Sequence, residues 1–273
     1  MVKKLFKHEF LYYTRVMSLV YLILLTIAGA GRVMQFFESD NIVYKIISVF
    51  YGLTYGISVL AAFGFVFVLA IVRFYKNLYS SEGYLTFTLP ATPAQHIWVK
   101  AITAVCMELV TLAVILLSGC VFSAGELLVE IWKAGAYILG TTYDLIGFHL
   151  VVILAEFSIL FVLMLLAGIM MYYTFISIGQ LFKKNRILAA VGAYFVYYIA
   201  SQVISTVLYI LITILSMTDR FADFMFWLGN LVQQHPYTFV HCGLWLYILI
   251  PVIFLIVEFV VIRRIITNKL NLE

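Results

Sequence analysis

The sequence predicts an all-α, polytopic membrane protein that crosses the bilayer six times. Apolar residues make up 65% of the 273 residues and charged residues only 11%, whereas soluble domains are about half apolar and about a quarter charged. The apolar residues gather in six runs, each long enough for the about 20 residues that a spanning helix needs. A globule of this size cannot bury so much apolar surface, so lipid must cover part of it. We therefore expect a single transmembrane domain over residues 1–273.

The six predicted spans, in chain order, cover residues 16–36, 46–72, 101–123, 147–181, 187–217 and 239–262. The fourth and fifth runs are longer than a bilayer requires, and we expect them to tilt or to extend into water. The first run is interrupted by Arg32 and has the basic leader of a signal peptide. It is nevertheless preceded by fifteen residues that include Glu9, which favours a retained span over a cleaved signal.

Residues 2–14 predict an amphipathic helix before the first span. Large apolar side chains recur along one face, namely Val2, Leu5, Phe6, Phe10 and Tyr13. The charged residues of this segment lie mostly elsewhere, namely Lys3, Lys4, Lys7 and Glu9. This periodicity favours an elbow helix in the cytoplasmic interface, with lysines toward anionic headgroups, over a simple polar leader.

The distribution of basic residues predicts the orientation of the chain. Of the 17 Lys and Arg residues, thirteen fall on the side that holds both termini and four on the other side. The side rich in Lys and Arg is normally cytoplasmic, so we expect both termini in the cytoplasm. The net charge of +4 is then explained by the orientation of the chain in the membrane, and no nucleic-acid partner is expected.

The longest polar interruption on the predicted cytoplasmic side covers residues 73–100. It keeps large apolar side chains, such as Tyr84 and Trp98, where a solvated loop would hold small and charged residues. Prolines punctuate it, and Thr92 is predicted to cap the helix that enters the third span. Two interpretations of the aromatic residues stay open on this evidence, a docking surface for a protein and side chains embedded among headgroups.

A second mixed segment, residues 218–238, lies on the opposite side before the last span. It combines charged residues such as Asp219 and Arg220 with aromatic residues such as Phe224 and Trp227. It is too apolar for a free loop and too polar to cross, so we expect a re-entrant or interfacial helix there.

Within residues 73–100 the chain resembles a known family. The runs Arg73-Phe74-Tyr75-Lys76-Asn77 and Glu82-Gly83-Tyr84-Leu85-Thr86-Phe87-Thr88-Leu89-Pro90 resemble the segment between the second and third spans of ABC type-2 transporter permeases of Gram-positive bacteria. Glu9-Phe10 and Arg15 look like the leader of the same family. The six-span layout agrees with this resemblance.

The resemblance implies a partner and a location. Permeases of this family pair as homodimers or with a paralogue in the bacterial plasma membrane, and each binds a separate ATPase subunit. The loop after the second span is their coupling segment, which carries over to Arg73, Tyr75, Lys76, Asn77, Glu82, Gly83, Tyr84, Phe87, Leu89 and Pro90. The basic loop at 183–186 is implied as a lesser contact. An apolar or amphipathic cargo, such as a drug, peptide or lipid, would suit the aromatic-rich spans.

The chain carries no motif of its own for ATP hydrolysis. A phosphate-binding loop needs a glycine followed by a lysine, and no Gly-Lys pair occurs in the sequence. We expect no enzyme activity and no cofactor in this chain, with ATP and Mg bound by the partner ATPase. The histidines also lack the spacing of a metal site.

Four polar residues inside the predicted spans are candidates for a substrate path or for polar helix packing: Glu108, Glu156, Gln202 and Glu258. A charge at the bilayer centre is costly, so each glutamate should face the protein interior, a wet cavity or a partner. Glu258 could pair with Arg263 or Arg264. Two other functions compete with a permease, a proton-coupled secondary transporter and a non-transporting sensor or immunity subunit.

Overall fold

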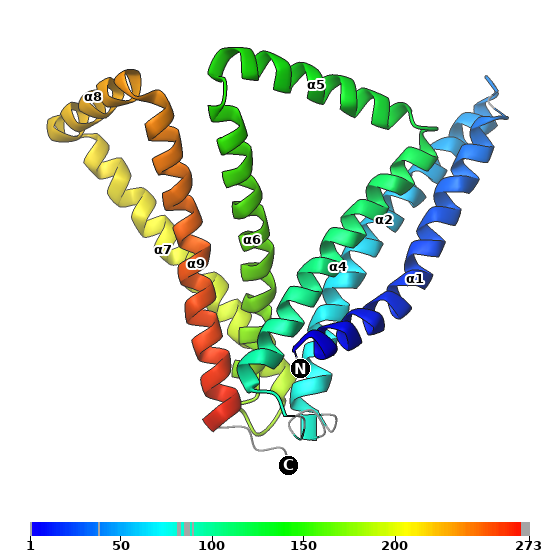
Figure 1. Cartoon of the computed structure of the whole chain (residues 1–273), viewed down its shortest axis with the longest axis horizontal. Helices are drawn as coiled ribbons and strands as arrows, with labels where there is room; N and C mark the ends of the chain where they lie inside the picture. The colour runs from blue at the N-terminus through cyan, green and yellow to red at the C-terminus, as the bar shows by residue number, and fades with distance from the viewer. Residues whose placement is uncertain (1, 38, 81–82, 85–87, 89, 269–273) are drawn as a thin grey trace. The chain divides into compact units, whose positions relative to one another are not determined.

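The computed structural model describes residues 2–37, 39–80, 83–84, 88 and 90–268, and every regular element among them is helical (Figure 1). In chain order the helices are α1 (Val2–Gln35), α2 (Ile42–Tyr79), α4 (Pro93–Phe122), α5 (Glu126–Ile146), α6 (His149–Gly179), α7 (Arg186–Ser216), α8 (Asp219–Gln234) and α9 (Pro236–Asn268). They form two compact units that meet in the chain after Gly147. The first unit holds α1 to α5 and the second holds α6 to α9.

Six of these helices, α1, α2, α4, α6, α7 and α9, are long and apolar enough to cross a membrane. Each contains most of one predicted span, so the prediction of an all-helical chain with six apolar helices is confirmed. Their surfaces are also apolar: α7 has no buried residue, and large side chains such as Leu208 are more than half exposed. Helices with so much exposed apolar surface are unstable in water, and the fold is that of a multi-pass membrane protein.

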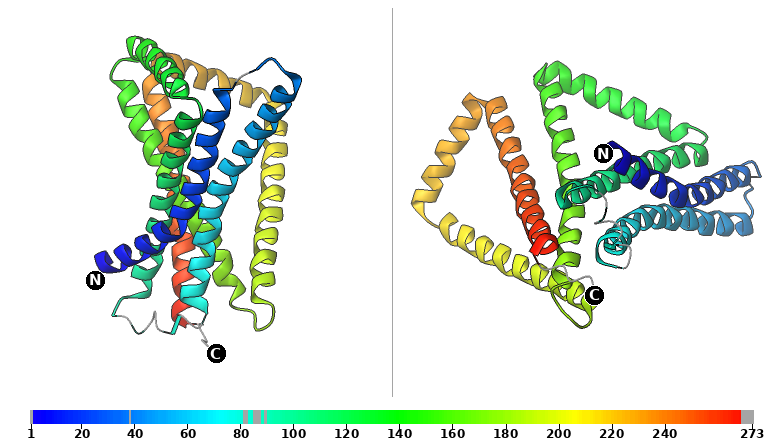
Figure 2. Two further views of the ribbon diagram at one scale, coloured as in Figure 1. Left: turned by 90° about the vertical axis from the view of Figure 1, so that its right-hand side faces the viewer. Right: turned by 60° about the horizontal axis from the view of Figure 1, so that its bottom comes forward.

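The first unit is organised around α1, which packs on both α2 and α4. Its buried residues fall mostly three or four apart, from Glu9 through Tyr13 and Met17 to Gly31, as one face of a helix requires. A Cβ at Gly31 would lie 2.6 Å from rings of Tyr51 and Phe122, so only glycine permits this approach. Figures 1 and 2 show that the first turns of α1 run at an angle to the rest of the helix.

Both ends of the loop between α2 and α4 are defined by local structure. Helix α2 ends at Tyr79, and α4 begins at Pro93, where the missing N–H of proline costs nothing. The hydroxyl of Thr92 accepts a hydrogen bond from the Gln95 amide at 3.4 Å, and the Gln95 side chain accepts one from the Thr92 amide at 3.0 Å. This reciprocal capping box confirms Thr92 as the predicted N-cap.

The second unit is built on α6, which packs against both α9 and α7. Ring contacts of Tyr172 and Phe175 with Tyr194 join the last turns of α6 to α7. A Cβ at Gly179 would lie 2.6 Å from the Arg186 carbonyl oxygen, so glycine allows the close turn from α6 to α7. Beyond that turn α7 diverges from α6 and α9 toward α8 (Figure 2).

Two shorter helices connect the ends of long ones. Helix α8 falls inside the predicted mixed segment at 218–238 and joins α7 to α9. No element is predicted for the residues of α5, because Glu126, Glu130, Lys133 and Asp144 interrupt their apolar pattern. Both helices display exposed aromatic side chains, including Trp132 at 77% exposure.

Candidate functional site

The candidate site lies where the first turns of α1 meet the end of α2 and the start of α4. The carboxylate of Glu9 accepts a hydrogen bond from Lys100 Nζ at 2.7 Å through Oε1 and one from Arg73 Nε at 3.2 Å through Oε2. Asn77 Nδ2 donates a third to Oε1 at 3.1 Å. One side chain of α1 therefore binds two residues of α2 and one of α4.

Burial gives this cluster its energetic weight. Glu9 is 4% exposed and Lys100 is 3% exposed, so neither charge keeps its water shell. Removing one partner from a buried ion pair typically costs about 3–5 kcal/mol, because the remaining charge stays buried without compensation. The three helices are thus constrained to move together wherever this cluster persists.

Arg73 makes a second contact that orients it. Its guanidinium carbon lies 3.8 Å from the centre of the Tyr12 ring, which is the geometry of a cation–π interaction. Tyr12 belongs to α1, as Glu9 does. Arg73 is therefore held to α1 both by a carboxylate and by an aromatic face.

The predicted coupling residues divide into an inward and an outward group. Arg73 and Asn77 point toward Glu9, and Gly83 is buried. Those facing outward are Lys76, Tyr84 and Pro90, with Tyr75 half-buried between the groups. Glu82, Phe87 and Leu89 lie outside the described residues. The contact between this loop and an ATPase stays a prediction.

The Glu9 cluster thus joins the two helices that flank the predicted coupling loop. Arg73 and Asn77 belong to the last two turns of α2, and Lys100 lies in the second turn of α4. Both flanks of the loop are consequently anchored to the same carboxylate. Displacing the loop as a whole would displace α1 with it.

A second polar cluster joins α6 to α9 in the other unit. His241 Nδ1 lies 2.8 Å from Glu156 Oε2, and His241 Nε2 lies 3.2 Å from His149 Nδ1. The Tyr237 ring stacks on His149 with 4.2 Å between ring centroids. Glu156 therefore has a partner on a neighbouring helix, as a role in polar helix packing requires, while a role in a substrate path stays untested.

The other candidates from the spans have different surroundings. Glu108 is buried within α4, at 5% exposure, and Gln202 is exposed on α7. Glu258 is buried on α9, and its Oε2 has no hydrogen-bond partner. Among the residues that the structure describes, no ion pair joins Glu258 to Arg263 or Arg264, both of which are exposed. The pairing expected from the sequence does not form.

Sequence reasoning missed the contacts of Glu9 with Arg73, Asn77 and Lys100. The sequence places Glu9 with the lysines on the polar side of the first helix, but it lies on the buried face with Tyr13. Lys100 was counted only as a topology signal. The spacing of Glu9 to Tyr13 and Met17, four residues each, was the available signal that the carboxylate faces inward.

In the described part of the chain, no group of three His, Cys, Asp or Glu residues is arranged to hold a metal ion. The two histidines beside Glu156 are already hydrogen-bonded to each other.

Comparison with models of known protein families, with curated proteins and with solved structures finds no match to this chain.

Proposed function

We propose that this chain is the membrane-spanning permease subunit of an ATP-binding-cassette exporter, coupled to a separate ATPase subunit. The observation that carries the proposal is that Glu9 binds residues on both helices that flank the loop that resembles a coupling segment. A loop that receives force from a motor needs rigid attachment to the helices it moves. The buried contacts of Glu9 to α2 and α4 supply that attachment.

In this proposal the outward residues of the loop meet the ATPase, and the inward residues transmit its movement. Tyr84 is 69% exposed and offers an aromatic anchor, which protein interfaces favour. Arg73, Asn77 and Lys100 pass the displacement to α1 through Glu9. ATP and Mg bind in the partner, since this chain has no Gly-Lys pair.

The proposal extends to assembly and location. Two copies, or one copy and a paralogue, would enclose the path in the plasma membrane of a bacterium, with both termini in the cytoplasm. The angled first turns of α1 would lie in the cytoplasmic interface as an elbow helix. Lys3, Lys4 and Lys7 are exposed there and would face anionic headgroups.

One observation favours a second candidate, the proton-coupled secondary transporter. Glu156, His241 and His149 form a continuous hydrogen-bonded series between α6 and α9, and such series carry protons in membrane proteins. Under that function, transport would follow a pH gradient without any ATPase. A non-transporting sensor or immunity subunit gains no support from a particular contact.

The direct test uses the chain co-expressed in turn with the ABC ATPases of its own genome and reconstituted in lipid nanodiscs. We expect the chain and one of these ATPases to co-purify and to hydrolyse ATP, and we expect scrambling residues 83–90 to abolish both. Scrambling eight residues of α5, 126–133, is the matched control and should leave association intact. Equal association of the ATPase with both scrambled variants would refute the proposal.

A second variant separates docking from transmission. Glu9→Gln leaves the outward face of the loop unchanged but weakens the contacts to Lys100 and Arg73. We expect normal ATPase association with a several-fold loss of ATP-driven transport. Loss of association in Glu9→Gln would place Glu9 in docking instead.

A further inference from the structure

The second unit contains a cavity of about 660 Å³ between α6, α7 and α9. Its volume lies within the range of about 300–1,000 Å³ that is usual for small-molecule sites. The cavity lies beside the turn from α6 to α7, because its lining residues come from the last turns of α6, the first turns of α7 and the later half of α9. Most of its lining is apolar, and the aromatic residues Phe175, Tyr197 and Phe254 contribute to it.

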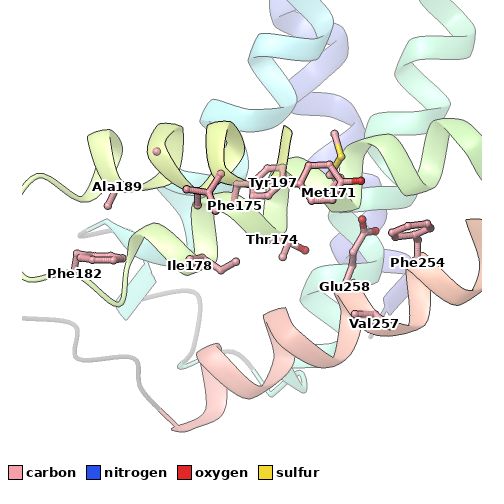
Figure 3. Close-up of a pocket in the computed structure, with 13 residues that line it drawn as sticks. Met171, Thr174, Phe175, Ile178, Phe182, Ala189, Tyr197, Phe254, Val257 and Glu258 are labelled. Carbon is pink, nitrogen blue, oxygen red and sulfur yellow. The ribbon is translucent and has the colours of Figure 1, made fainter. Parts of the chain in front are cut away.

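The lining of this cavity includes one acidic residue, Glu258. Glu258 is 8% exposed, and its Oε2 is buried without a hydrogen-bond partner. Figure 3 shows its carboxylate directed into the space beside Thr174 and Phe254. Burying an unpaired carboxyl costs free energy, and Glu9 in the first unit shows how the same chain satisfies a buried carboxyl with hydrogen bonds from three side chains.

The surroundings of Glu258 identify the chemistry of a suitable ligand. A carboxylate attracts a cation, and the faces of aromatic rings attract cations as well. The rings of Phe175 and Tyr197 lie 5.4 Å apart at a tilt, so a bulky apolar ligand would meet more than one aromatic surface. A small hydrated cation would lose its water to a wall that offers few other polar groups, and a neutral ligand without a hydrogen-bond donor would leave Glu258 unpaired.

We propose that this cavity binds a lipophilic organic cation, with Glu258 as the counter-ion and the aromatic side chains around its apolar groups. The site names a cargo class for the proposed permease, and in that respect it rests on the proposed function. The binding itself requires no ATPase. It can therefore be tested on the chain alone.

The test measures binding of radiolabelled tetraphenylphosphonium to the full chain in phosphatidylcholine nanodiscs, with empty nanodiscs as the background. Tetraphenylborate, an anion of similar shape, is the matched probe. We expect saturable binding of the cation and none of the anion. Equal binding of both ions, or no saturable binding of the cation, would overturn the proposal.

Two variants assign the binding to this cavity. Glu258→Gln should weaken tetraphenylphosphonium binding at least about tenfold, because the ion pair is lost while side-chain size is kept. Asp144→Asn removes an equal charge from exposed α5 and should leave affinity unchanged. An unchanged affinity in Glu258→Gln would overturn the assignment.

Gly192→Leu keeps Glu258 but narrows the cavity. Gly192 lines the cavity, and a Cβ there meets no atom within 4 Å, so the added side chain starts in open space. We expect the cation to lose its saturable binding. If Gly192→Leu instead releases a co-purified phospholipid and cation binding is unaffected, the cavity is a lipid site and the proposal fails.

Failure here is distinct from failure of the proposed function. If the chain binds the cation through Glu258 but associates with no ATPase, the binding site is supported and the proposed exporter function is refuted. If the chain couples to its ATPase but does not bind the cation, the exporter function is supported and its cargo belongs to another class.

Discussion

Glu9 and Glu258 are both buried glutamates on long helices, and their surroundings differ completely. Glu9 accepts hydrogen bonds from three side chains on two other helices, whereas the buried Oε2 of Glu258 accepts none. The first arrangement stabilises the packing of α1, α2 and α4. The second leaves a buried oxygen without a hydrogen bond, which costs free energy until a ligand in the cavity supplies a partner. Burial alone therefore does not distinguish a structural carboxyl from a ligand-binding one; the partners do.

The largest effect is expected for Glu9→Ala. Arg73 and Lys100 would remain buried beside each other without their carboxylate, at a cost of about 3–5 kcal/mol. Thermal unfolding of the purified chain, followed by tryptophan fluorescence in detergent, should show a strongly lowered Tm or no folded protein. A Tm close to wild type would mean that the Glu9 cluster contributes little to packing.

Glu258→Leu is expected to stabilise the chain, whereas Glu9→Ala is expected to destabilise it. The leucine removes an unsatisfied buried oxygen and adds apolar volume to the cavity wall, so stability without ligand should rise by about 1–3 kcal/mol. The same unfolding measurement provides the test. A destabilised Glu258→Leu would show that the carboxyl has a stabilising partner, and the contrast with Glu9 would disappear.

Glu156 lies between these extremes, with one partner on a neighbouring helix. Glu156→Gln keeps a hydrogen-bonding side chain but removes its charge, and we expect a loss of about 1 kcal/mol. A matched His241→Asn variant should lose a similar amount, and the double variant should lose less than their sum. Additive losses would show that the 2.8 Å contact is not an energetic coupling.

The smallest effect is expected for Arg73→Lys. The positive charge beside Glu9 remains, but the planar group over Tyr12 is lost, at a cost of about 0.5–1 kcal/mol. Tyr12→Leu should produce a loss of similar size that is not increased further in the double variant. A loss in Arg73→Lys as large as in Glu9→Ala would assign the stability of the cluster to the guanidinium instead of the carboxylate.

Local sequence features predicted much of the fold. Six apolar runs became six long helices, and the capping signal at Thr92 was realised at the start of α4. These features depend on residues near each other in the chain. Helix α5 was not predicted, because its charged residues lower the hydropathy of a segment that is helical all the same.

The candidate site was only partly predictable. The loop that resembles a coupling segment was recognised from its residues, and Arg73 and Asn77 were singled out within it. Their contact with Glu9 joins positions 64 and 68 residues apart, and no periodicity in either segment specifies that pairing. The expected partners of Glu258 were wrong for a different, local reason: Arg263 and Arg264 follow it by five and six residues, so they do not share its face of the helix.

The sequence by itself determined the environment of this chain and its division into membrane-crossing helices, because hydropathy and helix length are properties of contiguous residues. Only the tertiary structure decided that Glu9 accepts hydrogen bonds from three side chains and that Glu258 faces a cavity. Those outcomes depend on how each helix is rotated and where it crosses its neighbours. Contacts between distant segments set that rotation, and a single sequence does not encode it in any local pattern.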